Sequence, residues 1–151
     1  MIRAAFLGAF LTLAACAQSP SELKYNPKAD PAADLRGALA QASRDGRNIL
    51  LDVGGEWCSW CHRMDKFVTE HEELRALLAK NYVLVKVNFS EENKNEAFLA
   101  GYPKVAGYPH LFVLDAKGRL LESKNTGDLE EGKGYNLQRF KDFLAQHVRR
   151  E

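Results

Sequence analysis

Cysteine and methionine are scarce in this sequence of 151 residues, which contains three cysteines and two methionines. An odd count leaves at least one cysteine without a partner in the same chain. Long hydrophobic runs are also missing, because the apolar and uncharged residues 4–15 are too few to span a bilayer as a stable helix. Internal repeats and low-complexity tracts are absent as well.

Neither sign of charge dominates the chain. The 21 basic and 20 acidic residues give a formal net charge of +1, which offers no electrostatic case for binding nucleic acid. Apolar residues make up 46% of the chain and charged residues 27%, which is typical of a globular protein and not of a disordered one. The length predicts a single folded domain.

The N-terminal residues have the features of an export signal. Arg3 supplies a positive start and an apolar stretch follows it, so residues 1–15 are predicted to be a signal peptide. The segment Leu13-Ala14-Ala15-Cys16 resembles a bacterial lipoprotein processing site, which implies that Cys16 becomes the lipidated first residue. Ala17 in place of aspartate then implies the outer membrane, facing the periplasm. The alternatives are an ordinary signal peptide and a core helix.

The next residues are predicted to separate the anchor from the domain. Residues 16–30 are polar, contain Pro20 and Pro27, and show no period that would form a core, so they are expected to be a lipidated N-terminus and tether. Residues 31–151 are predicted to form the domain. Without residues 1–15, whose one charged residue is Arg3, the basic residues number 20 and equal the 20 acidic ones.

Two cysteines lie three residues apart where a helix is predicted to begin. Cys58 and Cys61 follow an apolar strand, residues 48–53, and a glycine turn. The N-terminus of a helix carries a partial positive charge that favours the thiolate of Cys58. A purely structural disulfide here would close very few residues and remove little chain entropy. The pair therefore predicts thiol–disulfide redox chemistry.

This stretch resembles the active site of thioredoxin-fold proteins, and the resemblance extends over residues 34–149. It is most similar to periplasmic thioredoxin-like reductase domains, including the C-terminal domain of the transmembrane thiol:disulfide interchange proteins. Ser59-Trp60 departs from the Gly-Pro of thioredoxin between the cysteines. The resemblance is carried by Asn48 to Asp52, Trp57-Cys58, Cys61, Lys86-Val87-Asn88, Gly107-Tyr108-Pro109 and Lys117-Gly118.

The order of predicted elements is helix, strand, helix, strand, helix, hairpin, helix. This order favours an α/β protein with a thioredoxin-like fold, in which helices flank both faces of a central mixed four-stranded sheet. Helix starts are expected at Asp30, at Ser90 and at Asn136, and a break is expected where Thr69 and Glu72 fit a capping box. The strands are expected at residues 48–53, 82–89, 110–114 and 119–123.

Three residues are predicted to carry the catalysis. Cys58 is the expected nucleophile, and Cys61 would resolve the mixed disulfide to leave a Cys58–Cys61 bond. Asp52 ends the buried strand, where burial disfavours a charged carboxyl, so it could take the proton from Cys61. An acid at the matching position of thioredoxin has that proposed role. Lys86 is expected either to lie near Asp52 or to be solvated.

Four residues are predicted to contact a protein substrate. The resemblance implies a cis bond between Tyr108 and Pro109, abutting the cysteines and leaving a backbone edge for the substrate chain. Tyr108 would flank the site. Trp57 and Trp60 are expected to form a partly exposed apolar rim, the alternative being that Trp57 only packs on the sheet.

Other functions fit parts of the same motif. Cys58, Cys61 and His62 match a c-type haem attachment pattern with His62 as axial ligand. A zinc site lacks a second ligand pair at finger spacing. A binding module with idle cysteines is the non-enzymatic alternative. The sequence favours none of these, and no metal or cofactor is predicted.

The prediction is a lipid-anchored, monomeric periplasmic enzyme that exchanges dithiols and disulfides on protein substrates. Reduction is favoured over oxidation or isomerisation, because the chain has no long helical insertion between Cys61 and Pro109 and no added dimerisation domain. The resemblance implies that a membrane thiol:disulfide transporter supplies the electrons.

Overall fold

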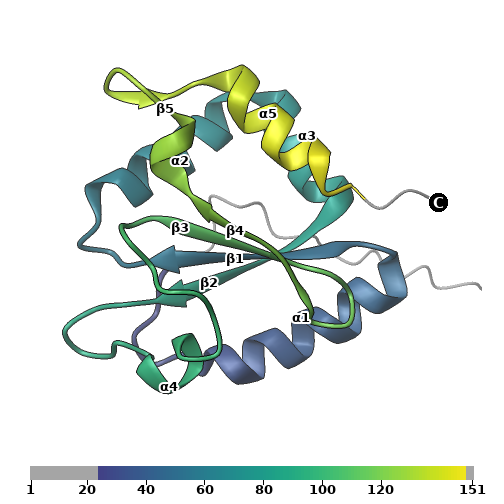
Figure 1. Ribbon diagram of the computed structural model, residues 1–151, viewed down its shortest axis with the longest axis vertical. Helices are drawn as coiled ribbons and strands as arrows, with labels where there is room; N and C mark the ends of the chain where they lie inside the picture. The colour runs from purple at the N-terminus through teal and green to yellow at the C-terminus, as the bar shows by residue number, and fades with distance from the viewer. Residues whose placement is uncertain (1–23, 149–151) are drawn as a thin grey trace, which may run out of the picture.

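A four-stranded sheet forms the centre of the molecule (Figure 1), in a computed structural model that describes residues 24–148. The strand order is β2-β1-β3-β4. β1 and β2 run parallel, whereas β3 is antiparallel to both β1 and β4, so the predicted mixed sheet is confirmed. The strands are β1 (Asn48–Gly54), β2 (Tyr82–Asn88), β3 (His110–Leu114) and β4 (Leu120–Asn125).

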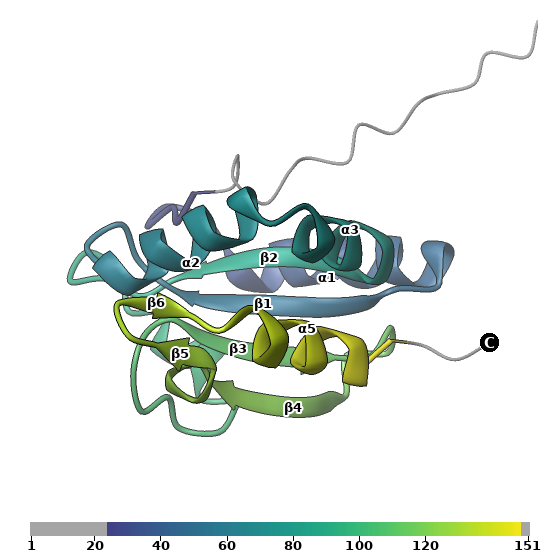
Figure 2. The same ribbon diagram turned by 90° about the horizontal axis from the view of Figure 1, so that it is seen from above.

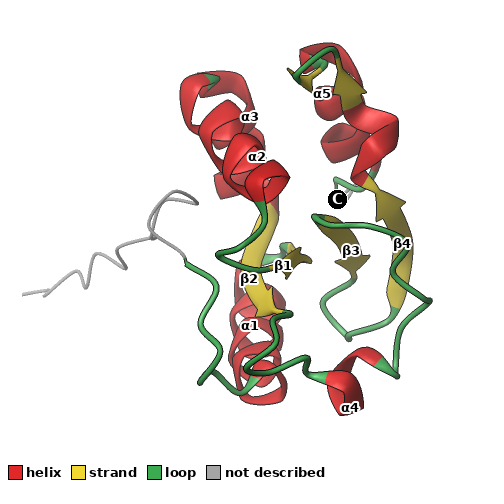
Figure 3. Ribbon diagram, turned by 90° about the vertical axis from the view of Figure 1, so that its left-hand side faces the viewer, coloured by secondary structure: helices red, strands yellow, loops and turns green. Residues whose placement is uncertain are grey.

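Helices cover both faces of the sheet, as predicted. Figure 3 shows α2, α3 and α5 on one side and α1 and α4 on the other. Seen from above in Figure 2, α3 lies over the β2 side of the sheet and α5 over the β3 side. No helix within residues 24–148 is long and apolar enough to cross a membrane. The helices are α1 (Pro31–Asp45), α2 (Ser59–Glu70), α3 (Glu72–Asn81), α4 (Glu96–Leu99) and α5 (Leu137–Gln146).

β1 is the strand that positions the active site. All seven of its residues are buried, because it has a neighbouring strand on each side and helices on each face. Side chains alternate between the two faces of a strand. Ile49, Leu51 and Val53 pack in the core on the α1 side, while Leu50 packs in the core on the α2 side. The same alternation directs Asp52 toward α2.

The ends of α1 and α5 follow local capping chemistry, and these predictions are confirmed. Asp30 accepts a hydrogen bond from the Ala32 N–H, and Gly46 closes α1 with a φ of 68°. Asn136 accepts from the Arg139 N–H at 2.9 Å at the start of α5.

Two predicted caps are wrong. α2 continues through Thr69, whose hydroxyl donates to the Asp65 carbonyl at 2.7 Å, and the break occurs at His71. Ser90 forms a turn with Asn93 and does not begin a helix, and α4 starts later, at Glu96. The Ser90 hydroxyl accepts from the Asn88 side-chain amide at 3.0 Å and from the Asn93 N–H at 3.4 Å.

The segment after β4 contains short elements where only a polar loop is predicted. A 3-10 turn, Thr126–Leu129, leads into the small hairpin of β5 (Glu130–Glu131) and β6 (Gly134–Tyr135). Thr126, Leu129 and Tyr135 are buried, so this segment closes the core beside α2 and α5.

Tyr25, which falls within the predicted tether of residues 16–30, packs against the domain. Tyr25 is only 3% exposed and forms hydrogen bonds with residues of the sheet and of the loop before α2. The predicted signal peptide and Cys16 lie outside the described residues.

Candidate active site

The two cysteines lie where the chain turns from β1 into α2. The Cys58 N–H donates to the Gly55 carbonyl at 3.0 Å, which forms the turn, and Cys58 is the N-cap of α2. Cys58 Sγ accepts a hydrogen bond from the Cys61 N–H at 3.1 Å. The two residues form a disulfide with their Cα atoms 5.2 Å apart. A sulfur in this position can accept hydrogen bonds from the free N–H groups of the first helical turn and lies at the positive end of the helix dipole. Both interactions favour the thiolate.

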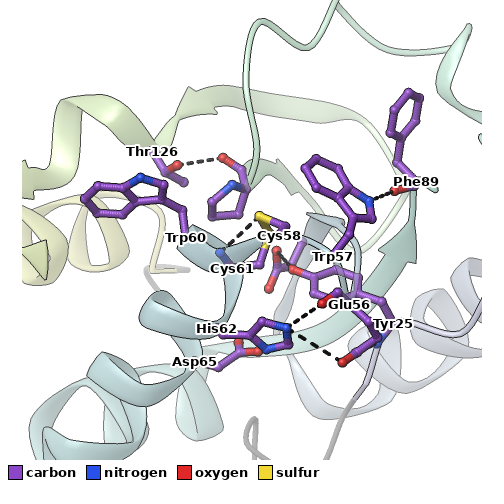
Figure 4. Close-up of a disulfide and its surroundings, with 12 residues drawn as sticks. Tyr25, Glu56, Trp57, Cys58, Trp60, Cys61, His62, Asp65, Phe89 and Thr126 are labelled. Carbon is purple, nitrogen blue, oxygen red and sulfur yellow. Dashed lines mark hydrogen bonds and ion pairs between the residues drawn. A yellow bond between two sulfur atoms is a disulfide. The ribbon is translucent and has the colours of Figure 1, made fainter. Parts of the chain in front are cut away.

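The two sulfurs differ in their access to solvent. Cys58 keeps 3% of its surface exposed, whereas Cys61 is completely buried. Trp60 and Tyr108 pack against the small cluster that contains both cysteines, and Figure 4 shows the disulfide with Trp60 drawn to one side and Trp57 to the other. Cys58 is therefore the one of the pair that lies nearer to the solvent.

A buried ion pair lies on the α2 face of the sheet. Asp52 and Lys86 are paired in the parallel register of β1 and β2, so their side chains emerge on the same face. Lys86 Nζ lies 2.6 Å from Asp52 Oδ2 and 2.6 Å from Asp65 Oδ1. The prediction that Lys86 lies near Asp52 is confirmed. Asp52 is thus not an isolated carboxyl, since a cation reaches it.

Of the three charged residues Asp52, Lys86 and Asp65, it is Asp65 that contacts solvent. Burial works against the charged form of Lys86, but the carboxylates of Asp52 and Asp65 outweigh it and raise the pKa of Lys86, which therefore stays protonated. Burial raises the pKa of Asp65 to about 6, although Lys86 opposes the shift. The Asp65 side chain is 26% exposed. It can therefore exchange a proton with solvent near neutral pH while it contacts the buried lysine.

The aromatic side chains near the disulfide form an exposed rim. Trp57 is 58% exposed and donates its indole N–H to the Phe89 carbonyl at 2.6 Å. Its ring meets Tyr108 edge-on at 5.6 Å, and Tyr108 stacks on Phe89 at 4.8 Å. Trp57 thus does more than pack on the sheet. Its large exposed ring is held rigidly beside the disulfide.

Trp60 lies on the other side of the site and is half-buried. Its ring meets Tyr135 edge-on at 5.6 Å, and the Arg63 guanidinium lies 4.8 Å from the centre of the indole. This cation–π contact places a positive charge next to the apolar rim.

The proline loop lies beside the cysteines. The Tyr108–Pro109 peptide bond is cis. The buried Thr126 hydroxyl donates to the Pro109 carbonyl at 2.6 Å, which ties this loop to the turn after β4. Tyr108 packs against the cluster of Tyr25, Cys58 and Cys61. The structure therefore brings together Trp57, Trp60, Tyr108 and Pro109 around one sulfur pair.

Sequence reasoning missed Tyr25 and Asp65. Asp65 follows Cys61 by four residues, which is one helical turn, so helical spacing could have placed it on the same face. Tyr25 has no comparable signal, because it lies in a polar segment 27 residues before the Asp52 that it contacts.

The arrangement does not favour the metal or haem alternatives. His62, the axial ligand of the haem alternative, has its Nε2 atom 2.8 Å from the Glu56 carbonyl oxygen, in the loop before α2. Within residues 24–148 no three His, Cys, Asp or Glu side chains gather as a metal site would require.

Comparisons with known proteins agree with this geometry. Residues 30–116 match the family model described as thioredoxin-like. The chain is 30% identical over 135 residues to the disulfide bond reductase DsbH of Chlamydia pneumoniae, covering 78% of this chain and 81% of that protein. A solved structure of a disulphide isomerase from Xylella fastidiosa Temecula1 is 28% identical, with a TM-score of 0.70, and covers 82% of this chain and 95% of that one.

A longer protein matches over one part of its length. The thiol:disulfide interchange protein DsbD of Salmonella typhi is 28% identical over 103 residues, which cover 68% of this chain. This chain spans only 18% of that protein. The names of these relatives include a reductase, an interchange protein and an isomerase, so they agree on disulfide chemistry and differ on its direction.

Proposed function

Since this chain belongs to the thioredoxin-like family and is a thiol–disulfide oxidoreductase of the DsbH and DsbD type, we propose that it reduces disulfides of other proteins in the periplasm. One observation carries the proposal. Cys58 and Cys61 are bonded at the start of α2, next to a cis-proline loop, and only Cys58 reaches the surface. A dithiol in this arrangement can pass both of its electrons to a visiting disulfide.

The exchange proceeds in two balanced steps. The Cys58 thiolate attacks one sulfur of a substrate disulfide, a Cys58–substrate bond forms, and the other substrate sulfur leaves as a thiolate that takes up a proton. The Cys61 thiol then gives its proton to Asp52 and attacks Cys58. The Cys58–Cys61 bond forms, the second substrate sulfur leaves, and it takes up the proton. The substrate gains two electrons and two protons, which the enzyme loses.

The rim residues serve as the docking surface for the substrate chain. Trp57, Trp60 and Tyr108 offer apolar and aromatic area around a sulfur that is otherwise shielded. Pro109, at the start of β3, leaves a backbone edge beside the cysteines for an extended segment. Such pairing tolerates many sequences, because it uses the main chain of the partner.

Reduction is the favoured direction. DsbH, which is similar over most of both chains, is called a disulfide bond reductase. Between Cys61 and Pro109 the helices are the rest of α2, the ten-residue α3 and the four-residue α4, and none of them is a long insertion. A reductase in an oxidising compartment needs an electron supply, and a membrane thiol:disulfide transporter is the proposed donor.

The redox potential of the Cys58–Cys61 pair tests the direction. We expect a potential of about −250 mV or lower, below that of the glutathione pool, as befits a reductase. Equilibration of the protein with defined ratios of reduced and oxidised glutathione, followed by alkylation and mass measurement, gives this value. A potential of about −120 to −180 mV would instead identify an oxidase or an isomerase.

We further propose that a lipid on Cys16 anchors the protein to the outer membrane through the tether that follows it. In fractionated bacterial cells the wild-type protein is expected in the outer membrane. Cys16→Ser should move it to the soluble periplasmic fraction, because the acyl chains are lost. Ala17→Asp keeps the lipidated cysteine and should shift the protein to the inner membrane. Membrane retention of Cys16→Ser would rule the lipid anchor out.

A further inference from the structure

Residues 24–30, here called the N-terminal strap, lie against the active site. The Tyr25 N–H donates to Glu56 Oε1 at 2.9 Å, in the loop that precedes Cys58. The Asn93 side-chain amide donates to the Pro27 carbonyl at 2.9 Å. These two contacts hold the strap on the domain and bring the Tyr25 side chain inward, where only 3% of the residue remains exposed. The exchange mechanism described above gives Tyr25 no part.

The hydroxyl of Tyr25 completes the surroundings of the active-site carboxylate. It donates to Asp52 Oδ1 at 2.7 Å, while Lys86 donates to Asp52 Oδ2 at 2.6 Å. Each carboxylate oxygen therefore has one strong donor, and the two donors come from different parts of the chain. Lys86 also lies 3.4 Å from the Tyr25 hydroxyl and 4.4 Å from the centre of its ring. With both oxygens held, the carboxylate has one orientation.

The same hydroxyl lies close to the resolving sulfur. A Cβ added to Gly54 would lie 2.5 Å from Cys61 Sγ and 2.8 Å from the Tyr25 hydroxyl oxygen. The sulfur and the hydroxyl thus converge over the one residue of β1 that has no side chain. Tyr25, Cys58 and Cys61 form a buried cluster of their own. Tyr25 therefore holds the Asp52 carboxylate by a hydrogen bond and packs in the same cluster as the Cys61 sulfur.

The Tyr25 hydroxyl remains a donor throughout the working pH range. Burial, reinforced by the negative charge of Asp52, raises the pKa of Tyr25 well above its ordinary value. The phenol therefore stays protonated and cannot itself take the proton of Cys61. The hydroxyl can instead hold its hydrogen-bond acceptor, the Asp52 carboxylate, in place.

We propose that Tyr25 is a positioning residue of the exchange reaction, whose hydroxyl holds the Asp52 carboxylate beside Cys61 for the second step. The proposal rests on the proposed role of Asp52 as proton acceptor. In that step the Cys61 proton passes to Asp52, the Cys61 sulfur bonds to Cys58, and the Cys58–substrate bond breaks to release a thiolate. The N-terminal strap thereby becomes part of the active site.

The groups that face Asp52 determine how Tyr25→Phe should change the pH dependence of the second step. These are Lys86 from β2 and Tyr25 from the strap, with Asp65 of α2 behind Lys86. A hydrogen bond donated to a carboxylate favours its charged form. Tyr25→Phe removes that donor but keeps the ring against Lys86. We therefore expect the variant to lose more of its second-step rate at acidic pH than at neutral pH.

A two-phase reaction isolates the step in question. The reduced protein reacts with dithiobis(nitrobenzoate), and each coloured thiolate released is followed by stopped-flow absorbance. The first phase, attack by Cys58, depends on reagent concentration, and the second, attack by Cys61, does not. For Tyr25→Phe we expect the pH midpoint of the second phase to rise by about one unit, which slows it about tenfold below the midpoint. The first phase should change less than about twofold.

Three companion variants separate the possible outcomes. Tyr102→Phe, a tyrosine outside this cluster, should leave both phases unchanged. Asp52→Asn should slow the second phase about a hundredfold, and adding Tyr25→Phe to it should have no further effect on the midpoint. An unchanged second phase in Asp52→Asn would overturn the proton-acceptor role itself. A slow Asp52→Asn variant with a wild-type midpoint in Tyr25→Phe, or a rate loss equal at every pH, would overturn the positioning role alone.

Discussion

Replacing Cys58 with serine is expected to abolish disulfide exchange, whereas Cys61→Ser should stop the reaction halfway. Serine is close to cysteine in size, so the fold is retained while the nucleophilic sulfur is lost. Without Cys58 the pair keeps only Cys61, which is completely buried. Without Cys61 the first step still occurs, and the Cys58–substrate disulfide has nothing inside the protein to displace it. Cys58→Ser should therefore not react with the substrate at all, whereas Cys61→Ser should stop at the mixed disulfide.

Reduction of insulin measures the overall activity, and non-reducing gels detect the trapped complex. Activity should fall to the uncatalysed rate in both variants, but only Cys61→Ser should accumulate a covalent complex with a protein substrate. Cys16→Ser, prepared as a soluble protein, is the matched cysteine control and should retain full activity. Equal trapping by Cys58→Ser and Cys61→Ser would contradict the assignment of the nucleophile.

Gly54→Ala is expected to damage both the stability and the activity of the protein. The added methyl would lie 2.5 Å from Cys61 Sγ and 2.9 Å from Tyr25 Cζ, which is far inside van der Waals contact. Neither side chain can move away easily, because Cys61 forms a disulfide with Cys58 and the Tyr25 hydroxyl forms a hydrogen bond with Asp52. Overpacking of this kind typically costs about 1–3 kcal/mol in unfolding free energy. Relief of the clash would displace the sulfur or the strap, so exchange should slow as well.

Gly37→Ala provides a matched control, because Gly37 lies on the exposed side of α1 with nothing within 4 Å of its added Cβ. This helical substitution should stabilise the protein by about 0.5–1 kcal/mol and leave exchange unchanged. Urea unfolding of the oxidised proteins and insulin reduction by the reduced proteins give the two readouts. A Gly54→Ala variant as stable and as active as the wild type would show that the space over Gly54 is not required.

Much of the architecture could be predicted because its signals are local. The cap of Asp30, the φ of 68° at Gly46 and the cap of Asn136 each depend on neighbours within a few residues. The position of Cys58 at the start of α2 follows from the same kind of signal. The wrong caps at Thr69 and Ser90 are also local, since the Thr69 hydroxyl donates to the Asp65 carbonyl inside α2 and Ser90 closes a turn with Asn93.

The redox pair and its place at a helix start were readable from the amino acids alone, because spacing and helix chemistry act over three or four residues. The proton-handling surroundings were not. The register of β1 against β2 brings Lys86 to Asp52, and burial together with Lys86 sets the behaviour of Asp65. Tyr25 reaches Asp52 across 27 residues of chain. Such contacts depend on which surfaces meet when the layers pack, and no local pattern encodes that.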